Sequence, residues 1–176
     1  MKHLVPRRDR YEVIVVGGGH AGIEASLSAA RIGCLTALVT IDPMAIGRMS
    51  CNPAIGGTAK GHLVREVDAL GGEMGKIADH TGIHFRMLNK SKGPAVWSPR
   101  CQNDREWYSR EASIRVQSQA GLDIIAGSIC DIHVDGGRIA GVLLEDGIRL
   151  SCRALILCNG TFLNALMHTG QVSHPG

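Results

Sequence analysis

A chain of 176 residues with 44% hydrophobic content is long enough to bury one sizeable core, which favours a single domain. The net charge of +3 is a mild excess that does not by itself identify a polyanionic partner, and aromatic residues make up only 3% of the chain. Residues 1–10 are charged, and the apolar run behind them is too short for a signal peptide or a membrane span. We therefore expect a cytoplasmic protein with no membrane segment, in which residues 1–10 form a solvated polar leader.

Six cysteines are present, but no pair has Cys-x-x-Cys spacing and no His/Cys cluster has zinc-finger spacing. We therefore expect no metal site and, in a reducing compartment, no disulfide framework. Cys34, Cys152 and Cys158 lie in apolar helix or strand patterns and are interpreted as small core residues. The role of Cys101 stays open.

A glycine-rich turn follows the first apolar run. Residues 13–16 are four aliphatic β-formers, and Gly17, Gly19 and Gly22 follow at G-x-G-x-x-G spacing before an Ala-rich helical pattern. This order of strand, turn and helix is typical of a dinucleotide-binding unit, in which main-chain amides at the helix start approach a pyrophosphate. An ordinary glycine-rich turn is the alternative, and the position between strand and helix argues against it.

The next segments complete a βαβ unit. The spacing predicts a helix over residues 20–31, ended by Gly33, and a second parallel strand over residues 35–40. Such units usually carry an acidic residue at the end of the second strand to bind the ribose hydroxyls. Thr40 occupies that place and Asp42 lies two residues further on, so either Asp42 reaches back or Thr40 and main chain hold the ribose.

The middle of the chain alternates loops and helices. Residues 42–59 and 91–100 are rich in Gly and Pro and are expected to be ordered loops without regular elements. Residues 58–70 are predicted to be a helix with an apolar face of Leu63, Val64, Val67 and Leu70. The secondary structure of residues 73–93 is left open.

A second long helix is expected after the second loop. Asn103 is interpreted as its N-cap, with Glu106 completing a capping box and Gly121 following the final turn. Its arginines are expected on a solvated face; they are Arg105, Arg110 and Arg115.

From residue 122 the pattern changes to short strands with hairpin turns. An antiparallel meander of four strands is predicted over about residues 122–150, followed by a continuous apolar strand at residues 153–157 that ends before Asn159 and Gly160. Residues 163–176 are expected to form a truncated tail without a closing element. The predicted fold is therefore α/β, a Rossmann-like parallel sheet with inserted helices and a small antiparallel β-meander, in one domain over residues 11–162.

This organisation resembles the first FAD-binding segment of two-dinucleotide flavoproteins. Within them it resembles the MnmG (GidA) family, flavoproteins that modify wobble uridines of tRNA. Three stretches carry the resemblance: residues 17–22, residues 49–57 (MSCNPAIGG), and residues 86–89 with 92–100 (RMLN and KGPAVWSPR). The resemblance implies an enzyme that uses FAD, reduced nicotinamide (NADH) and a methylene-folate carbon, with tRNA and the GTPase MnmE as partners and a homodimer as the full-length assembly.

The resemblance also implies roles for individual residues. The FAD pyrophosphate would lie on Gly17, Gly18, Gly19, His20, Ala21 and Gly22, and Ile129 would touch the adenine region through its main chain. The remaining predicted cofactor contacts are Thr40, Asp42, Asn159 and Gly160. Cys51 matches a family cysteine proposed to act on the uridine ring, and a thiolate suits addition to C6 because that addition makes C5 nucleophilic.

The sequence also departs from the family. Family chains are several times longer, Cys101 stands where another residue is general, and Ala165 stands where glycine is usual. We therefore expect an FAD-binding portion that is inactive alone, either a fragment or a short gene product. The alternatives are a non-catalytic nucleotide-binding remnant or interaction module, and a folate-dependent methylase of the tRNA T-loop uridine, against which residues 50–54 argue.

Overall fold

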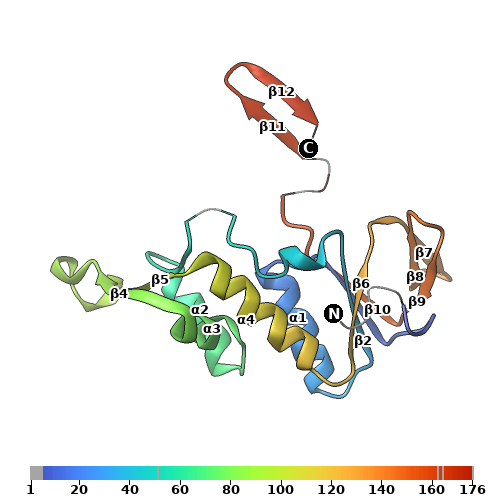
Figure 1. Cartoon of the computed structure of the whole chain (residues 1–176), viewed down its shortest axis with the longest axis horizontal. Helices are drawn as coiled ribbons and strands as arrows, with labels where there is room; N and C mark the ends of the chain where they lie inside the picture. Colours follow the sequence, from blue (N-terminus) through green and yellow to red (C-terminus); the bar gives the residue numbers. More distant parts are fainter. Residues whose placement is uncertain (1–5, 51, 162, 164, 176) are drawn as a thin grey trace.

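A four-stranded parallel sheet is the framework of the domain in the computed structural model, which describes residues 6–50, 52–161, 163 and 165–175 (Figure 1). Its strand order is β10-β1-β2-β6, and its bounds are β1 Val13–Val16, β2 Thr36–Thr40, β6 Leu122–Ala126 and β10 Ala154–Leu157. All five residues of β2 are buried, as expected for an apolar strand covered on both faces. The chain moves outward from β1 through β2 to β6 and then returns to the other side of β1, so the strand order reverses at β1. Ligands of such sheets bind at the carboxyl ends of the strands beside this reversal.

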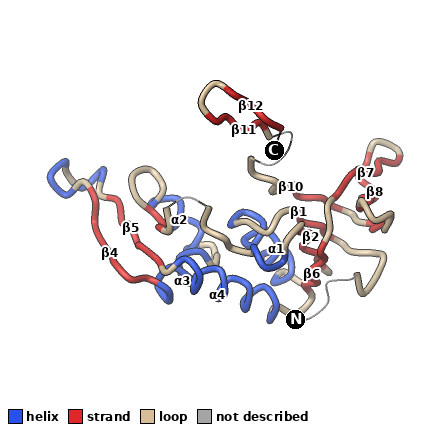
Figure 2. Tube along the Cα trace, turned by 45° about the horizontal axis from the view of Figure 1, so that its top comes forward, coloured by secondary structure: helices blue, strands red, loops and turns tan. Residues whose placement is uncertain are grey.

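Two helices cover one face of the parallel sheet. They are α1, His20–Arg31, and α4, Arg105–Ser118. Figure 2 shows α1 directly after β1, so the predicted βαβ unit is confirmed. Helix α1 ends at Arg31, two residues before Gly33, whose φ of +94° suits glycine at this position. The apolar layer under these helices includes Val15, Ile23, Leu27, Leu38, Tyr108, Ala112 and Val116.

An antiparallel meander covers the opposite face. It consists of β7 Ile129–Asp135, β8 Arg138–Leu144 and β9 Arg149–Ser151. A second buried cluster joins it to the parallel sheet, with Ile14, Val39, Ile125, Val142, Leu144 and Leu150 among its members. The domain is therefore built of three layers, with helices and meander on the two faces of one sheet.

The prediction that residues 122–126 begin the meander is wrong. Strand β6 pairs in parallel with β2, and its first four residues are buried. Asp123 made the segment resemble an alternating strand, but this side chain is buried and accepts a hydrogen bond from the Tyr11 hydroxyl at 3.1 Å. It also pairs with Arg8 at 3.3 Å, so the described part of the leader contacts the domain and is not a free arm.

A second, smaller sheet with two helices of its own lies beside the face of the parallel sheet that α1 and α4 cover. Its antiparallel sheet has the order β3-β5-β4, with bounds β3 Ala54–Gly56, β4 Gly82–Leu88 and β5 Ser98–Asn103. Helices α2, Gly61–Ala69, and α3, Met74–Thr81, accompany it, and short 3-10 turns η1 Pro43–Ala45, η2 Lys90–Lys92 and η3 Pro94–Val96 lie in the loops. The two Gly/Pro-rich loops thus contain short regular elements after all, because β3 and β5 complete this sheet.

Two further expectations change, the N-cap of α4 and the apolar face of α2. The N-cap of α4 is Asp104, not Asn103: the Asp104 carboxylate accepts from the Trp107 amide at 2.8 Å, while the Asn103 amide donates to Ala78 and Thr81 on α3. On α2, the expected apolar face is half covered, because Leu63 is 59% and Leu70 is 90% exposed.

The last described residues form a hairpin, although no closing element was expected there. Its strands are β11, Leu166–Thr169, and β12, Val172–Pro175, and Figure 1 shows it standing away from the rest of the chain. Gly170 turns between them with a φ of +64°. The described helices include none that is both long and apolar enough to span a membrane.

Candidate functional site: the glycine turn at the switch point

The glycine turn between β1 and α1 is fixed by close main-chain packing. Gly17 has a φ of +106°, and its amide donates to the Val39 carbonyl at 2.8 Å. A Cβ on Gly17 would overlap the Cys158 carbonyl oxygen, and one on Gly22 would overlap the Gly17 carbonyl oxygen. Both positions therefore require glycine because strand, turn and helix approach too closely for any side chain.

Gly19 differs from its neighbours because it faces open space. A Cβ built there meets no atom within 4 Å, and its φ of −75° is open to any residue. Gly19 is the N-cap of α1, and among the described residues no side chain caps this helix start. The first amides of α1 and the positive end of its dipole are thus available to an anion that reaches the turn from the Gly19 side.

The loop after β2 closes over the turn from the side. The Gly47 amide donates to the Gly18 carbonyl at 2.9 Å, and Ile46 and Thr40 lie against Gly18. The Ser109 hydroxyl of α4 then holds the Ile46 carbonyl at 2.6 Å. Sequence reasoning missed these contacts because they join segments that are distant in the chain and carry no motif.

The other predicted cofactor residues gather at the same edge of the parallel sheet. Asn159 and Gly160 follow β10, where the Cys158 amide donates to the Val16 carbonyl at 2.8 Å. Thr40 ends β2, and its carbonyl accepts from the Gly127 amide at 3.0 Å, two residues before Ile129. Carboxyl ends of parallel strands meet at one edge, so these residues border the glycine turn as the topology requires.

Asp42 is engaged locally. One carboxylate oxygen caps η1 by accepting from the Met44 amide at 2.9 Å, and the other pairs with Arg48 at 3.3 Å. Thr40 lies directly against Gly18. Of the two ways of holding a ribose, the arrangement places Thr40 nearer the turn.

The side chain of His20 is directed into the protein. Its ring packs edge-on against Tyr108 with 5.4 Å between the ring centroids, and Nδ1 lies 3.5 Å from the Tyr108 hydroxyl. Burial lowers the pKa of His20, against a smaller opposing effect of Glu24. The group that His20 can present to an anion is therefore its main-chain amide at the helix start.

The predicted nucleophile, Cys51, lies outside the described residues. The other cysteines are free, and burial raises the pKa of the Cys101, Cys152 and Cys158 thiols. Raised pKa values leave these thiols protonated at neutral pH, which suits core residues better than nucleophiles.

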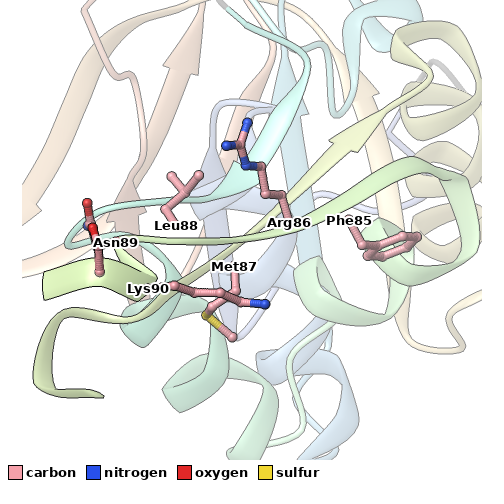
Figure 3. Close-up of a pocket in the computed structure, with 7 residues that line it drawn as sticks. Phe85, Arg86, Met87, Leu88, Asn89 and Lys90 are labelled. Carbon is pink, nitrogen blue, oxygen red and sulfur yellow. The ribbon is translucent and has the colours of Figure 1, made fainter. Parts of the chain in front are cut away.

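Two hollows lie away from the glycine turn. One hollow, of about 360 Å³, lies between the strands β4 and β5 and the helices α2 and α3. The other, of about 630 Å³, is lined by residues 85–91 at the far end of β4 (Figure 3). In the described chain, no group of three or more His, Cys, Asp or Glu side chains is placed to hold a metal ion.

Comparison with known proteins decides the family. The sequence model of the family described as glucose inhibited division protein A matches residues 12–176, which is nearly the whole chain. The chain belongs to the GidA family. The resemblance stated from the sequence is therefore confirmed.

Relatives of known name extend the comparison. A GidA relative from Protochlamydia amoebophila, named tRNA uridine 5-carboxymethylaminomethyl modification enzyme MnmG, is 53% identical over 167 residues, which are 95% of this chain and 27% of the relative. The solved structure of Aquifex aeolicus GidA has a TM-score of 0.91 and 48% identity, covering 96% of this chain and 28% of that one. The chain thus spans about a quarter of the length of these GidA proteins.

A more distant neighbour supports the fold class alone. PqsL of Pseudomonas aeruginosa, described as a probable FAD-dependent monooxygenase, has a TM-score of 0.61 at 17% identity, covering 86% of this chain and 43% of that one. The predicted α/β, Rossmann-like fold is therefore confirmed for this GidA chain by both its own sheet order and its neighbours.

Proposed function

We propose that this chain is the FAD-binding part of a flavoenzyme that modifies tRNA uridines, and that it is inactive without the rest of that enzyme. The observation that carries the proposal is the glycine turn. Gly17 and Gly22 are in close contact with main-chain atoms, whereas Gly19 faces open space at the start of α1, where no side chain caps the helix. That arrangement fits a pyrophosphate, the group that joins the two halves of FAD. Membership of the GidA family and the names of its relatives support the flavin and the tRNA substrate.

Each predicted residue has a share in holding the cofactor. The main chain of residues 17–22 binds the pyrophosphate, Thr40 or Asp42 the ribose, and the main chain of Ile129 the adenine region. Asn159 and Gly160 border the glycine turn from the end of β10. Bound FAD supplies the hydride and electron transfer that no side chain of this chain can perform.

Cys51 is proposed as the residue that acts on the uridine ring. The loop that contains it joins β2, at the edge of the glycine turn, to β3 of the second sheet. A thiolate there would add to the ring and make C5 nucleophilic. NADH and a methylene-folate carbon are the proposed co-substrates of the complete enzyme, MnmE its proposed protein partner and a homodimer its proposed assembly.

The proposal is tested by titrating the purified chain with FAD and following flavin fluorescence. We expect saturable binding of FAD, competition by ADP, and no comparable binding of FMN, because the glycine turn grips the adenosine diphosphate half. Equal binding of FAD and FMN would contradict the assigned role of the turn. Binding of ADP without FAD would favour the alternative of a nucleotide-binding module.

A further inference from the structure

The hairpin-like segment of residues 82–100, here called the β4–β5 arm, concentrates positive charge. It contains β4, the turns η2 and η3, and the first residues of β5, and Figure 1 shows its tip extending beyond the helices. Four of the chain's 19 lysines and arginines lie in it, and none of the 16 acidic residues. The mild positive charge of the whole chain is thus unevenly distributed, and the arm accounts for it.

Two of these cations face each other across the arm. Arg86 on β4 is the direct antiparallel partner of Arg100 on β5. Like charges opposite each other destabilise a sheet, and among the described residues no ion pair reaches either guanidinium. Such a pairing is relieved when an anion binds between the two groups.

The two arginines lie on the opposite face of the arm from Cys101, and both border the hollow between the arm and helices α2 and α3. Cys101 points the other way, because its thiol donates to the Ala78 carbonyl of α3 at 3.3 Å, and side chains alternate along a strand. Figure 3 shows Arg86 and Leu88 on one side of β4 and Met87 on the other. Arg86 is exposed and Arg100 is half-buried, so both can be reached from solvent.

The tip of the arm adds two lysines and an aromatic ring. Lys90 and Lys92 are exposed in η2. Trp97 is 42% exposed, and its indole nitrogen donates to the Lys90 carbonyl at 3.2 Å, which fixes the ring beside the lysines. A fixed, exposed ring next to cations is the combination on which nucleic-acid bases stack while their phosphates are neutralised.

We propose that the β4–β5 arm is an RNA-docking surface, on which Arg86 and Arg100 hold one backbone phosphate and the tip contacts the neighbouring nucleotides. The inference rests on the proposed function, which makes tRNA the substrate. An acidic protein surface would also satisfy the four cations, but the ring at the tip favours a partner with stacking bases. Docking there would leave the glycine turn free for the flavin, because the arm and the turn belong to different sheets.

The test compares two double variants by fluorescence anisotropy of a labelled tRNA transcript at several salt concentrations. The arm variant carries Arg86→Gln and Arg100→Gln; the control carries Arg138→Gln and Arg149→Gln, two exposed arginines of the meander, and has the same net charge. We expect the arm variant to bind RNA at least tenfold more weakly, and its slope of log affinity against log salt to fall by about 0.8, as for the loss of one neutralised phosphate. The control should keep its affinity within about threefold of the unaltered chain.

The remaining readouts separate the competing accounts. The arm variant should melt at or above the temperature of the unaltered chain, since repulsion is relieved; a clear fall would assign Arg86 and Arg100 a structural role and overturn the proposal. Equal losses in both variants, no loss in either, or displacement of RNA by polyglutamate at matched charge would also overturn it. FAD titration of the same samples tests the proposed function separately. If the unaltered chain does not bind FAD, the proposed function is wrong. If FAD binds normally and the arm variant keeps its RNA affinity, only the proposed role of the arm is wrong.

Discussion

The Gly17 carbonyl oxygen occupies the position from which a side chain at Gly22 would grow: a Cβ built there stands well under 3.0 Å from it. Strand β1 and helix α1 therefore approach each other so closely that position 22 has room only for the hydrogen atoms of a glycine. This contact aims the start of α1 at the edge of the sheet where the strand order reverses.

Gly22→Ala is expected to destabilise the chain by about 3 kcal/mol or more, because α1 must shift away from β1. Gly19→Ala is the matched control, since its methyl group enters open space, and its cost should stay near 1 kcal/mol for a poorer N-cap. Urea unfolding followed by circular dichroism measures both. Similar stability of the two variants would contradict the described turn.

Glu73 joins three elements through a buried carboxylate. Its side chain, 4% exposed, pairs with Arg31 of α1, Lys76 of α3 and Arg115 of α4. Burial by itself raises the pKa of Glu73, but hydrogen bonds from these cations, Arg31 first, outweigh it and lower the pKa below the ordinary value. Arg115 was expected on a solvated face and lies instead in this network.

Glu73→Gln should therefore cost about 2 kcal/mol at neutral pH, because three partly exposed cations lose the buried carboxylate that accepts their hydrogen bonds. A lowered pKa in the folded state means that the stabilisation is complete above about pH 4.5 and is lost as the pH falls through the folded value. Unfolding curves from pH 7 to 3 should fall steeply for the unaltered chain and less for this variant. Glu66→Gln, an exposed change on α2, serves as control and should follow the unaltered chain.

His20 gives a second pH dependence in a different window. Its pKa is lowered by burial, so protonation below about pH 6.5 favours the unfolded chain, and stability falls as the pH drops through this region. His20→Gln should remove that part of the pH dependence while leaving the fall below about pH 4.5. An imidazole resonance of His20 that titrates at or above the ordinary value would contradict the buried position against Tyr108.

Asp104 should behave as the helix cap. Asp104→Ala is expected to destabilise the chain by about 1 kcal/mol, and Asp104→Asn to restore most of it, because both Asp and Asn accept from the Trp107 amide. Thermal unfolding of the two variants measures the difference. A loss of stability that Asn does not restore would assign Asp104 another role.

The sequence predicted the βαβ unit well and the rest of the sheet only in part. The glycine spacing and the apolar run act locally, so α1 begins at His20 and ends at Arg31, as the spacing predicts. Strand β6 was misassigned because its buried Asp123 is satisfied by Tyr11 and Arg8, more than a hundred residues earlier. Local periodicity does not report such a partner.

The predictions for the helix cap and for the second sheet failed for the same reason as the prediction for β6. Asn103 and Asp104 are both residue types that favour the N-cap position. Asp104 takes it because the side-chain amide of Asn103 donates hydrogen bonds to the Ala78 carbonyl and the Thr81 hydroxyl instead. The short strands β3 and β5 lie in segments whose glycines and prolines are typical of loops, and only their pairing with each other and with β4 makes them strands. For the candidate site, the motif predicted the glycine turn. The hydrogen bond from the Gly47 amide to the Gly18 carbonyl carries no sequence motif and was found only in the structure.

The central claim is that the open side of Gly19 receives the FAD pyrophosphate, and FAD titration of Gly19→Glu tests it most directly. The new carboxylate would enter the open space at the helix start without disturbing the packing of Gly17 and Gly22, so the variant should fold and lose FAD binding by about a hundredfold or more, the range for an unpaired charge placed against an anion. Gln117→Glu adds the same charge at an exposed position of α4 and should bind FAD as the unaltered chain does. Unchanged FAD affinity in a folded Gly19→Glu chain would contradict the account.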